Sequence, residues 1–567
     1  MKRFLVTSAL PYINGIKHLG NLAGSMLPAD AFARFCRANG HETLFICATD
    51  EHGTPAELAA HDQGMDVADY CSKMHAVHQD LIDRFAISFD WFGRSHSPQN
   101  HELTQHFYHK LDENKLLEER TTPQFYSVGE ARFLPDRYVL GICPHCAYDR
   151  ARGDQCENCT RLLDPTDLIS PRSARSGSPE IEIRPSRHLF LRQSQLVDAL
   201  REWIEPQADW SPLVLSIARK WLNDGLKDRS ITRDLRWGVP VAYQGKLRPG
   251  FEDKVFYVWF DAPIEYISAT KEWADNTGTD WMRWWRLDKG ASEVRYVQFM
   301  GKDNVPFHTV GFPATLLGSQ EPWKLVDVIK GFNWLNYYGD KFSTSSHRGV
   351  FMNDALELLP ADYWRWYLLS NVPETSDVSF TWEHFQAVVN NDLANVFGNF
   401  VNRIVAFCTT RFEARIPSGG AYGDLERTTT STLQDHLEHL EHYLAEAEFR
   451  KAASELRSVW TAGNEYLQRA QPWVLLKTDP CAAAVVVRYG LNLACVFASV
   501  AAPFIPSTAN KIASALGIEA PPKWPASLET ALQQLQVGTS ISSPGILFHR
   551  LEDAQVESCK QRFKGNA

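Results

Sequence analysis

The sequence predicts an α/β protein whose parallel sheet is split by an insertion and followed by a bundle of helices. Two features of the chain predict this. Short apolar runs alternate with helical patterns in residues 1–115 and again after residue 231, whereas residues 382–515 carry helical patterns throughout. Between the two alternating stretches, four cysteines are spaced as metal ligands. A chain of 567 residues has room for about three or four domains.

The composition is that of a soluble globular protein, with 44% hydrophobic and 22% charged residues. The net charge of −10 excludes a global basic surface, so a polynucleotide would have to be held by local patches. The apolar run 4–9 is too short for a signal peptide and is followed by Pro11, and we expect no membrane-spanning run. The 11 cysteines do not form a secreted disulfide pattern. We therefore expect a cytoplasmic protein.

The first strand and helix form a candidate phosphate site. Residues 4–7 predict a buried strand, and residues 23–37 carry a helical pattern. His18 and Asn21 lie between them, where free backbone N–H groups gather at the start of a helix. Gly20 would let a ligand approach the backbone closely. Taken alone, a histidine in a loop is the commoner explanation of this pattern.

A second buried strand is predicted over residues 43–48 and ends beside Asp50. Ligands of parallel sheets bind beyond the carboxyl ends of the strands, so Asp50 should share a rim with His18. Asp50 either caps the following helix or offers a carboxylate to the ammonium group of a ligand. The pattern alone leaves both alternatives open.

The four cysteines of the insertion form two C-x2-C pairs with nine residues between them: Cys143, Cys146, Cys156 and Cys159. Two such pairs suit a tetrahedral zinc ion, because each turn brings two thiolates to one side of the metal. Four thiolates leave no open coordination position. The spacing therefore predicts one structural zinc ion rather than a catalytic one.

The strand pattern returns after the insertion. Residues 254–260, 295–300 and 326–330 predict three strands. Each strand is followed by a polar segment with a glycine in it or near it. Residues 338–349 then form a small polar segment with a glycine near each end, typical of a surface loop. This loop is either a plain connection or a phosphate clamp that includes Lys341.

Residues 382–515 predict a helix bundle, with amphipathic helices near residues 429–446, 449–470 and 480–500. Asn399 and Arg403 lie four residues apart and share one helix face. The plainer explanation of this pair is a solvated surface. Trp473 follows a proline between two helices, where an exposed indole could stack on an unpaired base.

These motifs resemble those of the class I aminoacyl-tRNA synthetases. His18-Leu19-Gly20-Asn21 is similar to their HIGH signature, with Asn21 in place of the final histidine, and the 338–349 loop lies where they carry the KMSKS loop. Further stretches are similar to the bacterial methionine-specific group, in that group's order over residues 5–475: 9–12, 45–50, 257–263, 301–303 with 307–308, the four-cysteine knuckle and 472–473.

The resemblance implies a Rossmann-like catalytic sheet and a role for each matching residue. The catalytic residues that it implies are His18, Asn21, Lys341, Thr344 and Arg233. The ATP site that it implies consists of His18, Gly20, Asn21, Gly301, Asp303, Lys341 and Thr344. The methionine pocket that it implies consists of Leu10, Tyr12, Asp50, Trp259, Ala262, Pro263, Tyr266 and His308. Asp50 would hold the substrate ammonium group and Arg233 the carboxylate. The anticodon readers that it implies are Asn399, Arg403 and Trp473.

The resemblance also implies an activity and an order of domains. L-Methionine and ATP with Mg²⁺ would give methionyl-adenylate and pyrophosphate, and the methionyl group would pass to the 3′ end of methionine tRNA. The expected domains are the first half of the catalytic sheet, 1–115; the zinc-knuckle insertion, 116–225; the second half of the sheet, 226–325; a stem-contact region with the KMSKS-like loop, 326–380; the helical anticodon-binding domain, 381–540; and a tail, 541–567. We expect a monomer with no membrane partner.

Two alternatives stay open. One is a class I synthetase for a branched aliphatic amino acid, although those usually carry a much larger editing insertion. The other is a non-catalytic relative that only binds tRNA. Thr344 favours the second alternative, because it stands where the KMSKS loop usually has its second lysine.

Overall fold

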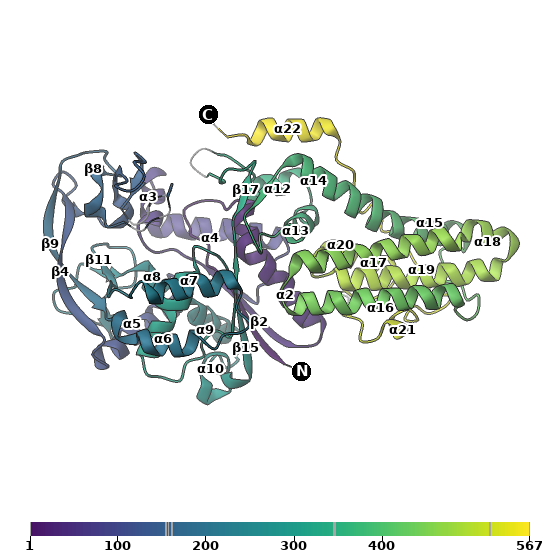
Figure 1. Cartoon of the computed structure of the whole chain (residues 1–567), viewed down its shortest axis with the longest axis horizontal. Helices are drawn as coiled ribbons and strands as arrows, with labels where there is room; N and C mark the ends of the chain where they lie inside the picture. The colour runs from purple at the N-terminus through teal and green to yellow at the C-terminus, as the bar shows by residue number, and fades with distance from the viewer. Residues whose placement is uncertain are drawn as a thin grey trace.

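The computed structural model describes residues 2–153, 156, 158–159, 161, 163–343, 347–520 and 523–565. A central α/β body carries a long β extension on one side and a helical bundle on the other (Figure 1). The expected position of Thr344 in the 338–349 loop lies outside the described residues.

A five-stranded parallel sheet forms the centre of the body, in the order β16-β15-β1-β2-β3. Its strands are β1 (Arg3–Ser8), β2 (Glu42–Thr49), β3 (Trp91–Arg94), β15 (Val294–Gly301) and β16 (Val328–Phe332). Because β1 pairs with β2 on one side and with β15 on the other, the two halves of the sequence form one sheet, as predicted. The chain reverses its direction of winding at β1, which makes the rim beyond β1 and β15 the expected ligand crevice.

Helices cover both faces of this sheet because successive residues of a strand point to opposite sides. Phe4 and Val6 of β1 pack in the same core as α2 (Leu27–Ala38), whereas Leu5 packs in a second core with α5 (Pro98–Glu113) and α9 (Glu265–Thr277). Strands that are buried on both faces require continuous apolar runs, which explains why the sequence predicted β1, β2, β15 and β16 correctly.

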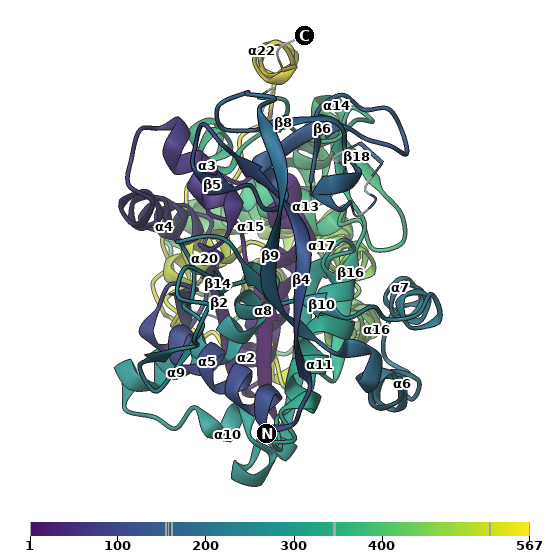
Figure 2. The same ribbon diagram turned by 90° about the vertical axis from the view of Figure 1, so that its left-hand side faces the viewer.

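The insertion contains a long two-stranded arm with a knuckle at its end. The strands β4 (Leu117–Ser127) and β9 (Ile181–Leu191) pair antiparallel along their whole length and cross the front of the molecule in Figure 2. The knuckle is a three-stranded sheet in the order β7-β6-β8, formed by β7 (Ala151–Arg152), β6 (Val139–Ile142) and β8 (Ile169–Ser173).

The predicted strand over residues 254–260 is wrong. Only β14 (Val255–Phe256) is extended, and it pairs with β11 (Thr232–Arg233). The chain then turns into the short helix α8 (Val258–Asp261), where the N–H groups of Phe260 and Asp261 both donate to the carbonyl of Tyr257. A short apolar run cannot distinguish a buried strand from a buried helical turn, so the pattern was ambiguous here.

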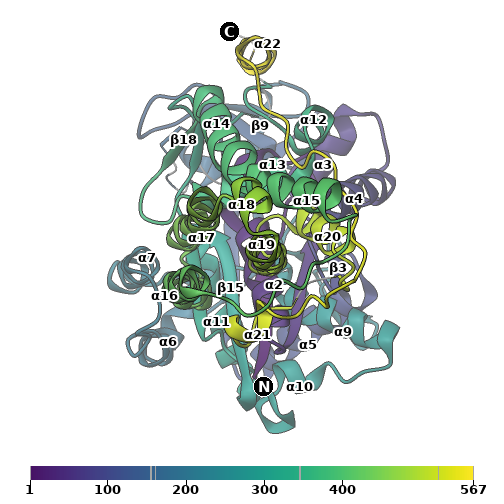
Figure 3. The same cartoon turned by 90° about the vertical axis from the view of Figure 1, so that its right-hand side faces the viewer.

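The C-terminal part is a helix bundle, seen almost end-on in Figure 3. Its main helices are α15 (Asn399–Arg411), α16 (Asp424–Ala445), α17 (Phe449–Ala470), α19 (Pro480–Ala501) and α20 (Pro506–Ala515). The expectation that no run could span a membrane needs correction, since α19 is long and apolar enough by composition, with a mean hydropathy of 1.8. This window of α19 is 83% buried inside the bundle, which accounts for its apolar character.

Buried polar contacts join the bundle to the body, because the guanidinium of Arg365 donates both to Asp30 of the body and to the carbonyls of Pro503 and Phe504 of the bundle. Arg365 of α13 (Ala361–Ser370) lies 2.6 Å from Asp30 of α2, and both side chains are fully buried. The tail is not plain coil, because it ends in the helix α22 (Asp553–Phe563), whose Phe563 stacks on Trp382 at 5.8 Å between ring centroids.

Candidate active site

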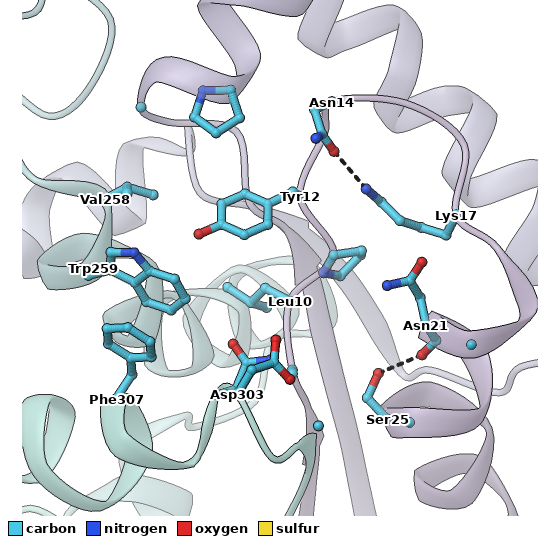
Figure 4. A pocket seen from close by; sticks show the side chains of 18 of the residues that line it. Leu10, Tyr12, Asn14, Lys17, Asn21, Ser25, Val258, Trp259, Asp303 and Phe307 are labelled. Carbon is cyan, nitrogen blue, oxygen red and sulfur yellow. Dashed lines mark hydrogen bonds between the residues drawn. The ribbon is translucent and has the colours of Figure 1, made fainter. Parts of the chain in front are cut away.

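A cavity of about 500 Å³ opens beyond the carboxyl ends of β1 and β15. Side chains from distant parts of the chain line it, as Figure 4 shows: Leu10, Tyr12, Asn14, Lys17, Asn21, Trp259, Asp303 and Phe307. His18, Gly20, Gly301 and Lys341 also line it. The crevice that the strand order indicates therefore contains most of the residues that the sequence assigned to ATP.

One end of the cavity is polar and centres on His18, which caps the short helix α1 (Leu19–Asn21). The backbone N–H of Asn21 donates to His18 Nδ1 at 3.3 Å, and the backbone N–H of His18 donates to Asn21 Oδ1 at 3.2 Å. Burial and the neighbouring Lys17 lower the pKa of His18 to about 3. The ring is therefore neutral near pH 7, and its remaining proton lies on Nε2, where it can be donated.

Gly20 leaves room for the ring of His18 in this turn. A Cβ atom at residue 20 would lie 3.0 Å from the ring of His18. Gly301 has a similar role on the opposite wall, where a Cβ atom would lie 2.7 Å from Asp303 Oδ1. Both glycines make room for a side chain that lines the cavity.

Lys17 is a residue of the polar end whose role the sequence did not reveal. Its ammonium group donates to Asn14 Oδ1 at 2.9 Å (Figure 4). Burial lowers the pKa of Lys17 to about 8, against an opposing effect of the Asp50 carboxylate. The sequence feature that could have pointed to Lys17 is its position directly before His18, on the connection between strand and helix.

The 338–349 loop contacts the polar end through Phe342, whose ring stacks on His18. Lys341 lines the cavity, with its ammonium nitrogen 4.5 Å from the ring centroid of Trp334. The described ends of the loop are paired, because Ser343 and Arg348 exchange backbone hydrogen bonds of 3.1 and 3.0 Å. The guanidinium of Arg348 forms an ion pair with Asp340 at 2.9 Å, so its charge is paired within the loop.

The other end of the cavity is aromatic. Trp259 stacks on Phe307 with ring centroids 3.6 Å apart, and Tyr12 meets Trp259 edge to face at 6.0 Å. Leu10 lines the same wall. Such a wall suits an apolar, polarizable side chain.

A second group of expected pocket residues is buried behind this wall and does not line the cavity: Ala262, Pro263, Tyr266 and His308. His308 Nδ1 donates to the carbonyl of Asn304 at 2.9 Å, so its Nε2 accepts from the hydroxyl of Tyr266, also at 2.9 Å. Burial lowers the pKa of His308 to about 4, which keeps the ring neutral. The pair supports the aromatic wall from behind.

Asp50 is fixed next to Tyr12 by its backbone. Its N–H donates to the carbonyl of Pro11 at 2.9 Å, and its carbonyl accepts from Ile13 at 3.0 Å. The carboxylate is buried, Asp50 does not line the cavity, and its Oδ1 has no hydrogen-bond partner among the described residues. Burial, together with the charges of Asp261 and Glu51, raises the pKa of Asp50 well above its ordinary value. A buried carboxylate oxygen without a partner is a position where a cationic ligand group would be stabilised.

Arg233 does not line the cavity, although the sequence placed it on the substrate carboxylate. Its guanidinium binds Asp136 Oδ2 at 2.8 Å and lies 3.7 Å from the ring centroid of Tyr257. Asp136 and Tyr257 do line the cavity, so Arg233 is one layer away from it. Asp136 belongs to the insertion, and the local pattern around Arg233 gave no sign of this pairing.

The four cysteines of the knuckle come together. The sulfur atoms of Cys143 and Cys159 are 3.9 Å apart, and those of Cys146 and Cys156 are 3.6 Å apart. All four sulfurs lie within 4.8 Å of one another. Tetrahedral zinc with Zn–S bonds of about 2.3 Å would separate its sulfurs by about 3.8 Å. The donor set therefore fits a tetrahedral metal ion.

The three expected anticodon readers lie on the helical bundle, far from the sheet. The guanidinium of Arg403 is 4.8 Å from the ring centroid of Trp473, which is the second residue of α18 (Pro472–Thr478) and is 37% exposed. Asn399 is exposed one turn before Arg403 on α15. Figure 1 shows α18 at the end of the bundle opposite to the sheet.

Comparison with known proteins agrees with this geometry. Residues 4–405 match the family model of tRNA synthetases class I (M), and residues 416–567 match that of the anticodon binding domain of methionyl tRNA ligase. Proteins named methionine–tRNA ligase are 59% identical in Caulobacter vibrioides over 567 residues and 58% identical in Ruegeria pomeroyi over 570 residues, with 100% of each chain covered.

A solved structure of Mycobacterium tuberculosis methionyl-tRNA synthetase in complex with methionyl-adenylate has a TM-score of 0.77 and 25% identity, over 97% of this chain and 100% of the other. The likeness confirms the predicted fold class, a Rossmann-like parallel sheet with a cysteine-containing insertion and a C-terminal helical part. Because the family model covers more than half of the chain and the relatives match along its whole length, the chain belongs to the methionine–tRNA ligases of the class I tRNA synthetases.

Proposed function

We propose that this chain activates L-methionine with ATP to methionyl-adenylate and pyrophosphate, and then transfers the methionyl group to the 3′ end of initiator and elongator methionine tRNA. The observation that carries the proposal is a single cavity with a cationic, N–H-rich end at His18 and an aromatic end at Trp259. The relatives that match the whole chain are named for the same ligase activity.

ATP would lie at the polar end, with its phosphates near His18 and Lys17. Adenylate formation needs little covalent help, because the developing negative charge is stabilised by donors and cations that are already in place. The Nε2–H of His18, the ammonium groups of Lys17 and Lys341, and the backbone at Gly20 are such groups. Asp303 on the opposite wall would accept hydrogen bonds from the ribose, and Mg²⁺ would accompany ATP as part of the substrate.

Methionine would lie at the aromatic end, with its thioether against Leu10, Tyr12 and Trp259 and its ammonium group on Asp50. The unpartnered Oδ1 of Asp50 supports this assignment. For Arg233 to reach the substrate carboxylate, its ion pair with Asp136 would have to open. Tyr266 and His308 would come into contact with the substrate only if the stacked pair of Trp259 and Phe307 moved aside.

The reaction is an in-line displacement at the α-phosphorus of ATP. A carboxylate oxygen of methionine forms the new bond to phosphorus, and the bond to the pyrophosphate oxygen breaks, so that pyrophosphate leaves with the electron pair. A hydroxyl of the terminal adenosine of the tRNA then attacks the methionyl carbonyl, and AMP leaves. Both steps use a site that holds the reacting groups in place.

The tRNA would span the molecule from the sheet to the end of the bundle. We assign anticodon recognition to Asn399, Arg403 and Trp473, since an exposed indole beside a guanidinium can stack on unpaired bases. The domain limits that we propose remain those expected from the sequence, with residues 326–380 contacting the acceptor stem and residues 381–540 the anticodon. We also propose that the protein acts as a cytoplasmic monomer.

The knuckle would hold one structural zinc ion. Its ligands would be the four cysteines, whose sulfur separations match a tetrahedral thiolate site. A zinc ion with four protein ligands has no open position, so it would stabilise the insertion and take no part in the reaction.

A scan of ATP–pyrophosphate exchange across all amino acids tests the proposal. We expect exchange with methionine that exceeds exchange with leucine, isoleucine or valine. Exchange with a branched aliphatic amino acid and none with methionine would favour the first alternative. No exchange with any amino acid, combined with tight binding of methionine tRNA, would favour a non-catalytic tRNA-binding protein.

A further inference from the structure

Three histidines gather behind the loop that carries Asp50, and the proposed reaction does not use them. His52 follows β2, His96 follows β3, and His101 lies in the first part of α5. The ring nitrogens His52 Nε2 and His96 Nδ1 are 2.9 Å apart, and His96 Nδ1 and His101 Nε2 are 3.4 Å apart. One ring nitrogen from each residue lies within 4.8 Å of the other two.

The separations of 2.9 and 3.4 Å are close to those of a metal site. A tetrahedral ion with bonds of about 2.0–2.1 Å to imidazole nitrogens would hold them about 3.3–3.4 Å apart. A hydrogen bond between His96 and His52 accounts for the shortest contact. The contact of His101 Nε2 with the same His96 Nδ1, at 3.4 Å, would need a second hydrogen bond at a nitrogen that carries only one proton or one lone pair, whereas one metal ion would account for all three nitrogens.

The surroundings hold the rings in the orientation that a metal needs. His52 Nδ1 lies 2.6 Å from Asp261 Oδ2, and both side chains are fully buried. When His52 donates its Nδ1 proton to this carboxylate, its Nε2 is left for a metal, which is the arrangement found around histidine ligands. The side-chain amide of Asn100 also holds this carboxylate. It donates to Asp261 Oδ2 at 3.5 Å and is itself fixed by a hydrogen bond of 2.7 Å to the carbonyl of Ser95.

The ring of His96 is fixed in a different way. It stacks on Trp237 with centroids 4.1 Å apart and an angle of 27° between the planes. The indole N–H of Trp237 donates to the carbonyl of Glu51 at 2.6 Å, which joins this stack to the segment of His52. His96 and His101 also line a separate cavity of about 1020 Å³, so a fourth coordination position would open into that cavity.

We propose that His52, His96 and His101 form a second metal site, separate from the four cysteines, for a divalent transition-metal ion that imidazole nitrogens prefer, such as Zn²⁺, Co²⁺ or Ni²⁺. The fourth ligand is water from the 1020 Å³ cavity. The bound ion ties β2 and its following loop to α5, and so braces the segment that carries Asp50. It does not depend on the cysteine site, with which it shares no ligand.

Cobalt binding to the full-length protein tests the proposal. The cysteine site is first filled with one equivalent of zinc, confirmed by elemental analysis, and Co²⁺ is then added and followed by calorimetry and visible absorption. We expect one further equivalent to bind, with the d–d bands of a nitrogen and oxygen site and no thiolate-to-cobalt charge-transfer band. The added ion should also raise the melting temperature.

Variants then assign the ligands. We expect His96→Gln and His101→Gln each to weaken cobalt binding by at least about 10-fold. His109→Gln is the matched control, because His109 lies on the same helix α5 outside the cluster and should leave binding unchanged. Each variant is checked for an unchanged zinc content and circular dichroism spectrum, which separates loss of a ligand from loss of folding.

Two outcomes would overturn the proposal. One is a zinc-loaded wild-type protein that takes up no further cobalt. The other is further cobalt that binds equally well to wild type, His96→Gln and His101→Gln. Neither result bears on methionine activation, which pyrophosphate exchange reports separately.

Discussion

The ring of His18 stacks on the ring of Phe342, with centroids 4.7 Å apart and planes inclined by 14°. This contact joins the strand–helix connection at the polar end of the cavity to the 338–349 loop. The loop therefore helps to orient the imidazole that we place on the ATP phosphates. An aromatic pair of this kind contributes about 0.5–1.5 kcal/mol.

Removing the ring should weaken catalysis more than methionine binding. We expect Phe342→Ala to slow ATP–pyrophosphate exchange by about 2- to 10-fold, the factor that corresponds to the stacking energy. The KM for methionine should change little, because Phe342 is at the polar end of the cavity. Phe342→Tyr keeps the ring and is the control; equal losses in both variants would show that stacking is not the cause.

Lys17 should determine the fall of kcat/KM for ATP at alkaline pH. Burial lowers the pKa of Lys17 to about 8, so its ammonium group is charged below pH 8 and loses its proton as the pH rises through 8. We expect kcat/KM for ATP to fall above about pH 8, since this parameter reports the free enzyme. Lys17→Arg should move the fall to higher pH.

Lys17→Met tests the same charge at a single pH. Removal of one preorganised electrostatic donor typically costs about 100-fold or more, so we expect a loss of about that size in exchange rate at pH 7. A rate within a factor of about two of wild type would exclude Lys17 from the phosphate site.

The buried pair of Asp30 and Arg365 should control acid stability. Burial acts to raise the pKa of Asp30, but Arg34, Arg365 and hydrogen bonds from Ser88 outweigh it and lower the pKa to about 2. A lowered pKa means that the ionised carboxylate stabilises the folded state above about pH 4. This stabilisation, roughly 2 kcal/mol, should be lost as the pH falls from about 4 to 2.

Asp30→Asn should remove this dependence and leave Arg365 buried without its charge partner. Breaking such a pair costs about 3–5 kcal/mol, which urea unfolding at neutral pH would measure. Asp80→Asn is the control, because Asp80 pairs with Arg84 at the surface. The account of the pair fails if the two variants lose equal stability.

Trp473 should act on tRNA and not on the adenylate. We expect Trp473→Ala to lower kcat/KM for charging of methionine tRNA by about 5- to 100-fold, the range for loss of one base stack. Pyrophosphate exchange should remain unchanged, because α18 lies at the far end of the bundle. Val474→Ala changes the neighbouring exposed residue and should have little effect; a fall in exchange with Trp473→Ala would contradict the assignment.

The central sheet could be predicted because its strands are buried on both faces and so appear as continuous apolar runs, as in β1 and β15. The turn at Trp259 could not, because α8 is a single helical turn of the same apolar residues. The sequence predicted a tail over residues 541–567 and no helix in it, yet α22 folds against Trp382. Its stability depends on packing between residues almost 200 positions apart, which no local pattern contains.

The candidate site likewise contains residues that the sequence could predict and residues that it could not. His18, Trp259 and Asp303 were identified by motif and line the cavity. Lys17 was missed because a single lysine in a connection has no pattern of its own. The pairing of Arg233 with Asp136 was missed because it joins the second half of the sheet to the insertion, and only the three-dimensional structure brings them together.

Formation of methionyl-adenylate without tRNA tests most directly whether one cavity holds both the nucleotide and the amino acid. In a rapid-quench experiment with saturating ATP and methionine, wild type should form about one equivalent of methionyl-adenylate per chain. Lys17→Met should form it more slowly, and Trp259→Ala should need more methionine to form it. A wild-type protein that forms no adenylate, or a Trp259→Ala protein with an unchanged requirement for methionine, would contradict the account.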